Sequence, residues 1–146
     1  MNKLDLVREW FEFAANDLRV AKHLSENMYP KPIEIVCYHC QQAVEKALKG
    51  YLIDNDVEPP YIHDLDKLCL MCIEYDSSFD AIQAACEKLN EYITAGRYPS
   101  TDEIVETDAV YALKEADKVY TFCADLIPEL RQEPEQEQAQ NPQQSM

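Results

Sequence analysis

Residues 33–51 read IEIVCYHCQQAVEKALKGY, and this stretch decides the fold. Apolar side chains recur along it three and four residues apart, which is the spacing of one face of an α-helix. The apolar positions are Ile33, Val36, Cys37, Cys40, Val44, Ala47, Leu48 and Tyr51. Pro32 suits the first turn of a helix, so we expect a helix with a broad buried face that begins near this residue.

The same spacing predicts helices on both sides of this stretch. Before it, residues 4–27 form a long amphipathic pattern that ends at the prolines of residues 30–32. The apolar stripe there is Leu4, Val7, Phe11, Ala14, Leu18 and Ala21. After it, we expect Asp64 to cap a short helix, Ser77 and Asp80 to form a capping box for the next, and Thr107 to cap a long last helix that Pro128 stops.

These helices predict an all-α fold, an up-and-down four-helix bundle with an additional short helix. The chain has only two glycines in 146 residues, too few for the many tight turns of a β-sandwich. We expect one domain over residues 1–128. Residues 129–146 are rich in Gln, Glu and Pro without core-forming residues, and they are expected to be a disordered acidic tail.

The formal charge of −15 makes binding to a long nucleic-acid duplex unfavourable, since phosphate neutralisation needs clustered Lys and Arg. A small nucleotide can still bind at a local basic site. The first residues mix charges into their apolar pattern and do not look like a signal peptide, and no apolar run is long enough to span a membrane. We therefore expect a cytoplasmic protein with no membrane association, in which the six cysteines are reduced.

Two Cys-x-x-Cys pairs, Cys37–Cys40 and Cys69–Cys72, have a spacing that zinc sites use. Both pairs, however, lie in apolar helical faces, whereas structural zinc knuckles sit on tight turns. Cysteine is also a common small core residue. We expect core thiols and no metal site.

Three basic residues are candidates for binding a nucleotide phosphate: Lys46, Lys49 and Arg97. The two lysines lie one helical turn apart within residues 31–50, a net-positive stretch with three Lys and two Glu. The alternative for Lys49 is a surface pair with Glu45 at i,i+4, worth a few tenths of a kcal/mol. Arg97 follows a long helix in a Gly/Pro loop, where it can bind a phosphate or pair with a carboxylate.

For the histidines and glutamines in the middle of the chain, a structural role is the alternative to a functional one. His39 lies beside the apolar stripe and is expected to be a satisfied structural group, and His63 to mark the start of a helix. Gln41 and Gln42 are adjacent, so at most one of them faces the core.

Aromatic residues exceed what one small core needs. Tyr92, Tyr98 and Tyr111 gather around the late loop, and Trp10 and Phe11 lie in the first helix. A self-complementary homodimer face is the use we expect for them.

Four motifs in this order resemble those of HEPN domains (higher eukaryotes and prokaryotes nucleotide-binding). The run CYHCQQAVEKALK, residues 37–49, is similar to the family's Gln-Gln-Ala-x-Glu-Lys-x-x-Lys signature. The other three resembling segments are Trp10 with Ala14, Asp17, Leu18 and Ala21; His63–Asp64–Leu65; and Tyr92 with Arg97–Tyr98–Pro99. Together they cover about residues 4–127.

The resemblance implies a five-helix bundle that is usually dimeric. It also implies partnership with a small nucleotidyltransferase of the MNT type, often in a toxin–antitoxin or stress module. Some members bind nucleotides, and others are metal-independent ribonucleases that use an Arg-x(4–6)-His motif. In some relatives the partner transferase adenylylates a tyrosine near that motif, and Tyr98 lies in the corresponding region.

The sequence departs from the ribonuclease motif. No histidine follows Arg97, since the last one in the chain is His63, and Arg19 and His23 are one residue too close. We therefore expect a non-catalytic module that binds a nucleotide, a partner protein or both, with no cofactor beyond that ligand. Two alternatives remain open: a degenerate ribonuclease that uses Arg97 with His39, His63 or Tyr98, and a structural homodimer that binds another protein.

Overall fold

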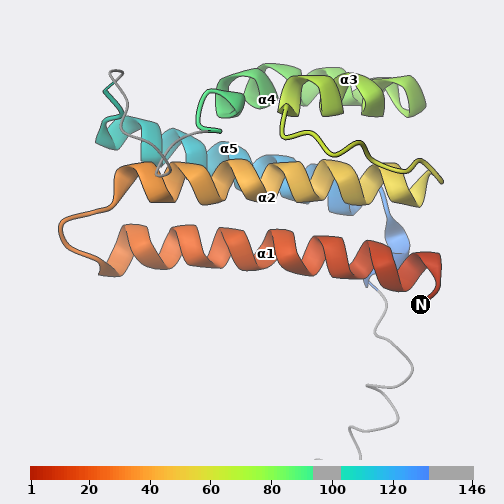
Figure 1. Cartoon of the computed structure of the whole chain (residues 1–146), viewed down its shortest axis with the longest axis horizontal. Helices are drawn as coiled ribbons and strands as arrows, with labels where there is room; N and C mark the ends of the chain where they lie inside the picture. The colour runs from red at the N-terminus through yellow and green to blue at the C-terminus, as the bar shows by residue number, and fades with distance from the viewer. Residues whose placement is uncertain (94–102, 132–146) are drawn as a thin grey trace, which may run out of the picture.

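The computed structural model describes residues 1–93 and 103–131. Within these residues the chain forms five α-helices and two short 3-10 helices (Figure 1). They are α1 (Lys3–Asn27), α2 (Ile33–Asp54), α3 (Leu65–Tyr75), η1 (Ser77–Ile82), α4 (Gln83–Asn90), α5 (Glu106–Asp125) and η2 (Pro128–Arg131). The predicted all-helical bundle with an additional short helix is confirmed.

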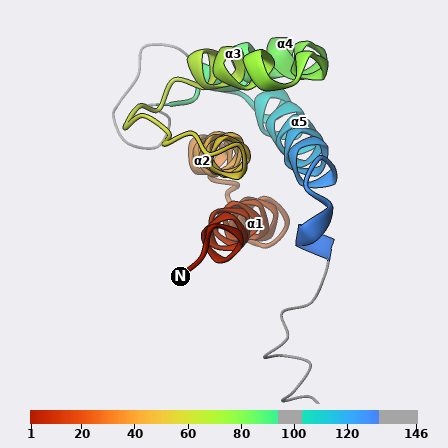
Figure 2. The same cartoon turned by 90° about the vertical axis from the view of Figure 1, so that its right-hand side faces the viewer.

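Helix α2 lies at the centre of the bundle. It runs antiparallel to α1, α5 packs along another side of it, and α3 and α4 form a layer over α2 and α5 (Figures 1 and 2). The stretch 33–51 therefore decides the fold because its apolar residues must face neighbours in several directions. Of the residues in α2, more than half are buried.

The core follows the predicted stripes. In α1 the side chains of Val7, Phe11, Ala14 and Ala21 are buried, and Leu18 packs against them. Phe79 stands where the layers meet, with its ring centroid 4.5 Å from that of Tyr51 and 5.1 Å from that of Phe122. Such tilted and edge-on ring pairs stabilise a core beyond the area that they bury.

Gly50 sets the spacing between α1 and α2. A Cβ atom at this position would lie 2.7 Å from Phe11 Cε2 and 3.3 Å from Trp10 Cβ. The two helices thus approach each other too closely for a side chain at residue 50.

The helix starts correct two of the predictions. Asp64 caps α3 as expected, because its carboxylate accepts the Lys67 N–H. The residue that caps the next segment is Asp76, not Ser77, and the segment begins as the 3-10 helix η1. A carboxylate one residue earlier reaches the Ser78 N–H at 2.9 Å, so the capping box of Ser77 and Asp80 is wrong.

The start of α5 is also different from the prediction. Thr107 lies within the first turn, and Val105 occupies the cap position. Because valine has no side-chain acceptor, the first turn is closed instead by Asp108, whose Oδ2 accepts the Val105 N–H at 2.8 Å. Asp108 also accepts the hydroxyl of Tyr92 at 2.8 Å.

At the carboxyl end, η2 continues the helical structure past Pro128 to Arg131, and Leu130 packs against the core. The expected tail therefore cannot begin at residue 129, and its remainder, 132–146, lies outside the described residues. None of the helices in the described ranges combines the length and apolar character needed to cross a membrane.

Candidate functional site

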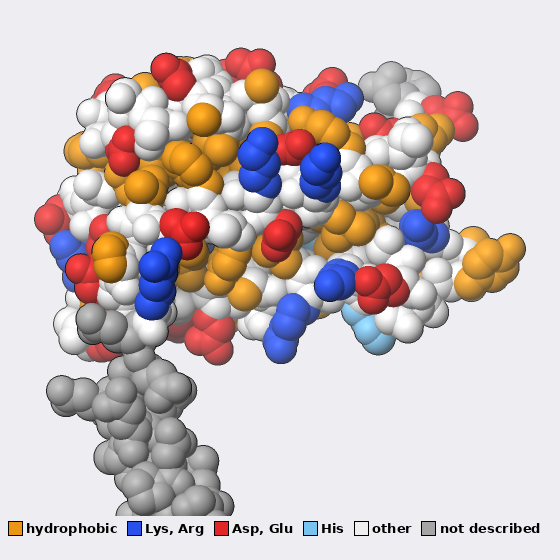
Figure 3. Space-filling view, turned by 180° about the vertical axis from the view of Figure 1, so that it is seen from behind, with side chains coloured by type: hydrophobic (Ala, Val, Ile, Leu, Met, Phe, Trp, Pro, Cys, Tyr) orange, Lys and Arg blue, Asp and Glu red, His pale blue; other side chains and the backbone are white. Residues whose placement is uncertain are grey.

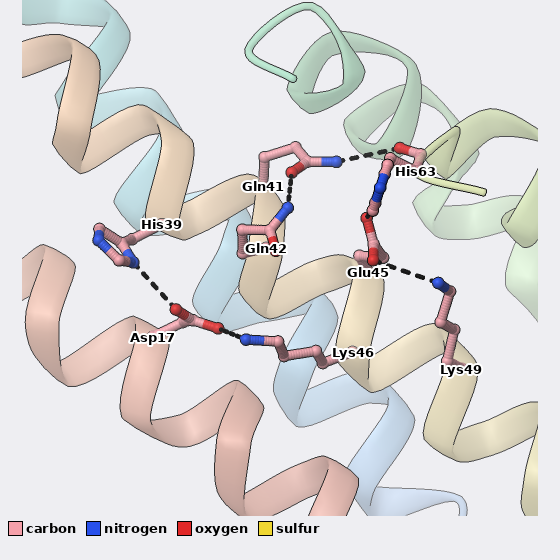
Figure 4. A network of polar contacts seen from close by, with 8 residues as sticks. All are labelled: Asp17, His39, Gln41, Gln42, Glu45, Lys46, Lys49 and His63. Atoms are coloured by element: carbon pink, nitrogen blue, oxygen red, sulfur yellow. Dashed lines mark hydrogen bonds and ion pairs between the residues drawn. The ribbon is translucent and has the colours of Figure 1, made fainter. Parts of the chain in front are cut away.

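The polar residues of the signature-like run occupy the side of α2 that faces α1 and the loop before α3 (Figure 4). They form two clusters with the same plan. In each cluster one carboxylate binds a lysine through one oxygen and a histidine Nδ1 through the other.

The first cluster joins α1 to α2. Asp17, on α1, accepts His39 Nδ1 at 2.9 Å and Lys46 Nζ at 2.5 Å. Its carboxylate is mostly buried, whereas the side chains of His39 and Lys46 keep about a quarter of their exposure. Two donors to one carboxylate compensate the loss of its hydration.

The second cluster joins α2 to the loop before α3. Glu45 accepts Lys49 Nζ at 3.2 Å and His63 Nδ1 at 2.9 Å. The side chains of Glu45 and Lys49 are 6% and 7% exposed, while that of His63 is 52% exposed. The pair of Glu45 and Lys49 exists as expected, but it is buried, so its description as a surface pair is wrong.

The two glutamines extend the second cluster. Gln41 is fully buried and its Nε2 donates to the His63 carbonyl at 3.1 Å. Gln42 is half-buried and donates to Gln41 Oε1 at 2.8 Å. Only Gln41 therefore faces the interior, as expected, and its amide holds the loop that positions His63.

The contact with a carboxylate fixes the same tautomer in both histidines, His39 and His63. A ring nitrogen bound to a carboxylate must donate, so Nδ1 carries a proton and the other nitrogen, Nε2, is the one left for a ligand or a proton. Carboxylate–histidine pairs hold an imidazole in this way in general bases and in metal sites. No group of three or more metal-ligating side chains occurs within residues 1–93 and 103–131.

The cysteine pairs lie in the core, as predicted. All six thiols are free and buried. Cys69 Sγ lies 3.7 Å from the Phe79 carbonyl and Cys72 Sγ 3.8 Å from the Leu48 carbonyl, so both are placed to donate to backbone. Burial raises the pKa of Cys37 to about 12 and raises that of Cys40 further, which keeps these thiols protonated.

The remaining motif residues are mostly structural. Asp64 Oδ1 also accepts Asn90 Nδ2 at 3.2 Å, which ties the start of α3 to the end of α4. Burial, followed by its hydrogen bond to Asp108, raises the pKa of Tyr92. Tyr92 and Phe11 are each 3% exposed, so their assignment to a dimer face is wrong, whereas Trp10 and Tyr111 are half-buried.

Arg97 and Tyr98 lie outside the described residues. Lys46 and Lys49, the other two phosphate-binding candidates, belong to different clusters, and each contacts a carboxylate. The role of Asp17 did not emerge from helix periodicity alone. The available signal was a carboxylate in a series that is otherwise apolar and is spaced by three and four residues along α1: Leu6, Trp10, Phe13, Asp17, Val20 and Leu24.

A second candidate place is a cleft of about 270 Å³ between α1, α5 and η2, lined by Arg8, Phe11, Tyr120 and Arg131 among others. Both arginines are engaged there: Arg8 donates to the Glu129 carbonyl and Arg131 to Asp125, each at 2.9 Å. The cleft is smaller than most ligand sites and its cations are already paired, so the clusters on α2 are the better candidate.

Comparisons with known proteins agree with the fold. The structure is similar to that of TT1696 from Thermus thermophilus, with a TM-score of 0.67 and 24% identity over 82% of this chain and 96% of the other. It is also similar to ST0689, an archaeal HEPN homologue, with a TM-score of 0.65 and 23% identity over 83% and 97%. At this identity the likeness shows the fold alone, and no curated protein matches the sequence significantly.

The family is shown by the sequence itself. The model of the HEPN domain matches residues 7–126, which include both clusters and four of the five helices in full. The run that begins at Gln41, the His63–Asp64 landmark and the Asp17 partner thus all lie within the matched region. The chain belongs to the HEPN domain family.

Proposed function

We propose that this chain is a non-catalytic HEPN module of the cytoplasm that acts as a homodimer and binds a nucleotide, a partner protein or both. Its partner would be a small nucleotidyltransferase in a toxin–antitoxin or stress-type system, as the family resemblance implies. The observation that carries the binding role is the cluster of Asp17, His39 and Lys46, which is fixed by hydrogen bonds yet partly open to solvent.

The cluster has unused capacity for an anion. A lysine ammonium has three donors, and Asp17 takes one of those of Lys46. The Nε2 atom of His39 lies outside its bond to Asp17, and it donates when the ring is protonated. A phosphate that bridges Lys46 and His39 would therefore keep the existing contacts to Asp17.

Lys46 is a better candidate for direct contact with a phosphate than Lys49. The Lys46 side chain is 27% exposed and that of Lys49 is 7% exposed. Lys49 neutralises Glu45 and thereby supports the position of His63. Arg97 remains a candidate on its sequence position alone.

Nucleotide binding is tested by calorimetric titration of the full chain with ATP, and then with GTP. Lys46→Ala should weaken binding about tenfold or more, since a hydrogen bond to a charged group contributes roughly 1.5–3 kcal/mol. Lys118→Ala, an exposed lysine on α5, is the matched control and should bind as the parent does. Equal affinity of the two variants, or no binding at millimolar nucleotide, would contradict the nucleotide role.

Partner binding is tested by purifying an amino-terminally tagged chain from its native lysate at moderate salt and identifying the co-purifying proteins. Recovery of a small nucleotidyltransferase in near-equal amount supports the module, and mass spectrometry of the same sample shows whether a tyrosine is adenylylated. Recovery of the chain alone argues against the partner. Recovery of a different protein, insensitive to added nucleotide, favours the structural-homodimer alternative.

One observation favours the degenerate-ribonuclease alternative. His39 and His63 are both oriented by carboxylates through Nδ1, which is the arrangement of a general base. If this alternative is right, single-stranded RNA is cleaved by the purified chain, and cleavage falls at least about a hundredfold in His39→Ala or His63→Ala. Absence of cleavage, or cleavage that survives both substitutions and Arg97→Ala, removes it.

A further inference from the structure

On the side of α1 and α2 that faces away from α5, exposed apolar residues repeat along the helices. In α1 a second series lies about a quarter turn from the core stripe: Leu6, Trp10, Phe13, Asp17, Val20 and Leu24. The residues of this series are spaced alternately by four and three, which is the spacing of the contact line between two packed helices. Leu6, Phe13 and Val20 are 39%, 51% and 41% exposed.

Helix α2 continues the same face. Its outward row begins at Ile35, which is 40% exposed, and passes through His39, Gln42 and Lys46 to the half-buried Ile53. The contacts of Asp17 with His39 and Lys46 hold the two rows side by side. In Figures 1 and 2, α3, α4 and α5 lie on other sides of α2, so that within residues 1–93 and 103–131 none of these helices lies over this pair of rows.

We infer that this α1–α2 face is the surface through which two copies of the chain associate. The inference rests on the homodimer of the proposed function and says which surface forms its interface. Two copies related by a twofold axis would align the apolar row of one α1 with the α1–α2 rows of the other, so that a four-helix layer forms across the axis.

Charge supports a second copy as the occupant. Each chain carries −15, so two copies repel each other at most surfaces. The opposite side of the molecule shows Lys, Arg, Asp and Glu side chains dispersed among apolar ones (Figure 3). In the two rows of the α1–α2 face, in contrast, the one carboxylate is that of Asp17, and Lys46 neutralises it before any partner arrives.

The size of the face also fits. Helices of 25 and 22 residues are about 33–38 Å long, and two of them side by side are roughly 20 Å wide, which gives a footprint of about 700 Å². Stable interfaces bury about 600–1,000 Å² from each partner. Other large exposed apolar residues, such as Leu70 on α3 and Val110 on α5, do not form such a series.

The cluster of Asp17 would then have a second role. It lies in the middle of the apolar row, and a polar group within such a contact line fixes register and orientation.

The test is the molar mass of the full chain in solution, measured by light scattering at tens of micromolar. The parent chain should have twice its 16.9 kDa. Phe13→Glu should raise the dimer dissociation constant about a hundredfold or more and give a monomer with unchanged circular dichroism. Val110→Glu is the matched control, since Val110 is also a large exposed apolar residue but lies on α5, and it should remain dimeric.

The outcomes separate this inference from the proposed function. A dimer that persists in both Phe13→Glu and Val20→Glu overturns the assigned face and leaves the homodimer standing. A monomeric parent overturns both. If Phe13→Glu does not fold, Val20→Glu alone decides.

Discussion

Glu45 and Lys49 form a buried ion pair, and its position explains why so many polar residues surround it. Removal of two charges from water is unfavourable, and their mutual attraction offsets this only when the remaining donors and acceptors are also bonded. Glu45 gains its second donor from His63, and Gln41 holds the loop that carries this histidine. The cluster is therefore one unit in which each member depends on the others.

Replacement of one partner should be far more damaging than replacement of both. We expect Glu45→Ala to lower the free energy of unfolding by about 3–5 kcal/mol, because it leaves the Lys49 ammonium buried without a carboxylate. The double variant Glu45→Leu with Lys49→Met should recover a large part of that loss. Urea unfolding followed by circular dichroism measures all three.

The exposed pair of Lys88 and Glu91 provides the control. Glu91→Ala should change the free energy of unfolding by less than about 1 kcal/mol, since exposed pairs are screened by water. An equally small effect of Glu45→Ala would mean that Lys49 finds solvent easily, and the buried description of this pair would be wrong.

The helices themselves were largely predictable, because apolar spacing reports which side of a helix is buried whatever it packs against. The caps of η1 and α5 were less so. Asp76 and Asp108 each lie one residue from the expected Ser77 and Thr107, and a short polar side chain at any of these positions can cap a turn. The choice depends on tertiary contacts such as that of Asp108 with Tyr92.

The polar clusters show a similar limit. Sequence spacing placed Gln41, Gln42, Glu45 and the lysines on one helix. The histidine that contacts Glu45 comes from a loop, however, and the carboxylate that contacts Lys46 comes from α1. Whether a lysine contacts solvent or a carboxylate depends on the packing of distant segments, which a single sequence does not report.

Helix α5 should depend on Asp108, which accepts both the Val105 N–H and the Tyr92 hydroxyl. We expect Asp108→Ala to lower the free energy of unfolding by about 1–3 kcal/mol at pH 7, and Tyr92→Phe to account for about half of this. Asp117→Ala, at an exposed position of the same helix, should have little effect. Thermal unfolding of the four proteins tests this.

Because of the same contacts, the stabilisation that Asp108 contributes should decrease as the pH falls. The hydrogen bond from Val105 is the main cause that lowers the pKa of Asp108. Because its folded pKa lies below the unfolded value of about 4, its stabilisation is complete above pH 4 and is lost as the pH falls below it. The effect of Asp108→Ala should therefore shrink in acid. Undiminished loss at pH 3 would contradict this.

The close approach of α1 and α2 at Gly50 should tolerate no side chain. Alanine favours a helix by about 1 kcal/mol over glycine, but its Cβ would lie 2.7 Å from the ring of the buried Phe11. Overpacking costs about 1–3 kcal/mol, so Gly50→Ala should be destabilising on balance. Combining it with Phe11→Leu should give a smaller loss than the sum of the two, whereas additive losses would place the clash elsewhere.

At the scale of the whole molecule, α2 belongs both to the core and to the candidate site. One side of it completes the core, and the other carries both carboxylate clusters and half of the proposed association face. Substitutions on the outward row should therefore change binding without loss of fold, while those at its buried positions should do the reverse.

The reaction of the six buried thiols can be used to detect transient exposure of the interior. A thiol reagent reacts with the thiolate, and here the thiols are shielded and the pKa of several of them is raised by burial. Modification should thus be slow in the native protein and proceed only through transient exposure of the interior, with a rate that follows the population of open molecules. Cys37 and Cys40 would report on α2, and Cys69 and Cys72 on the α3 layer. Peptide mass spectrometry would show which cysteines the reagent modifies first, and therefore which layer opens first, with no substitution in the chain.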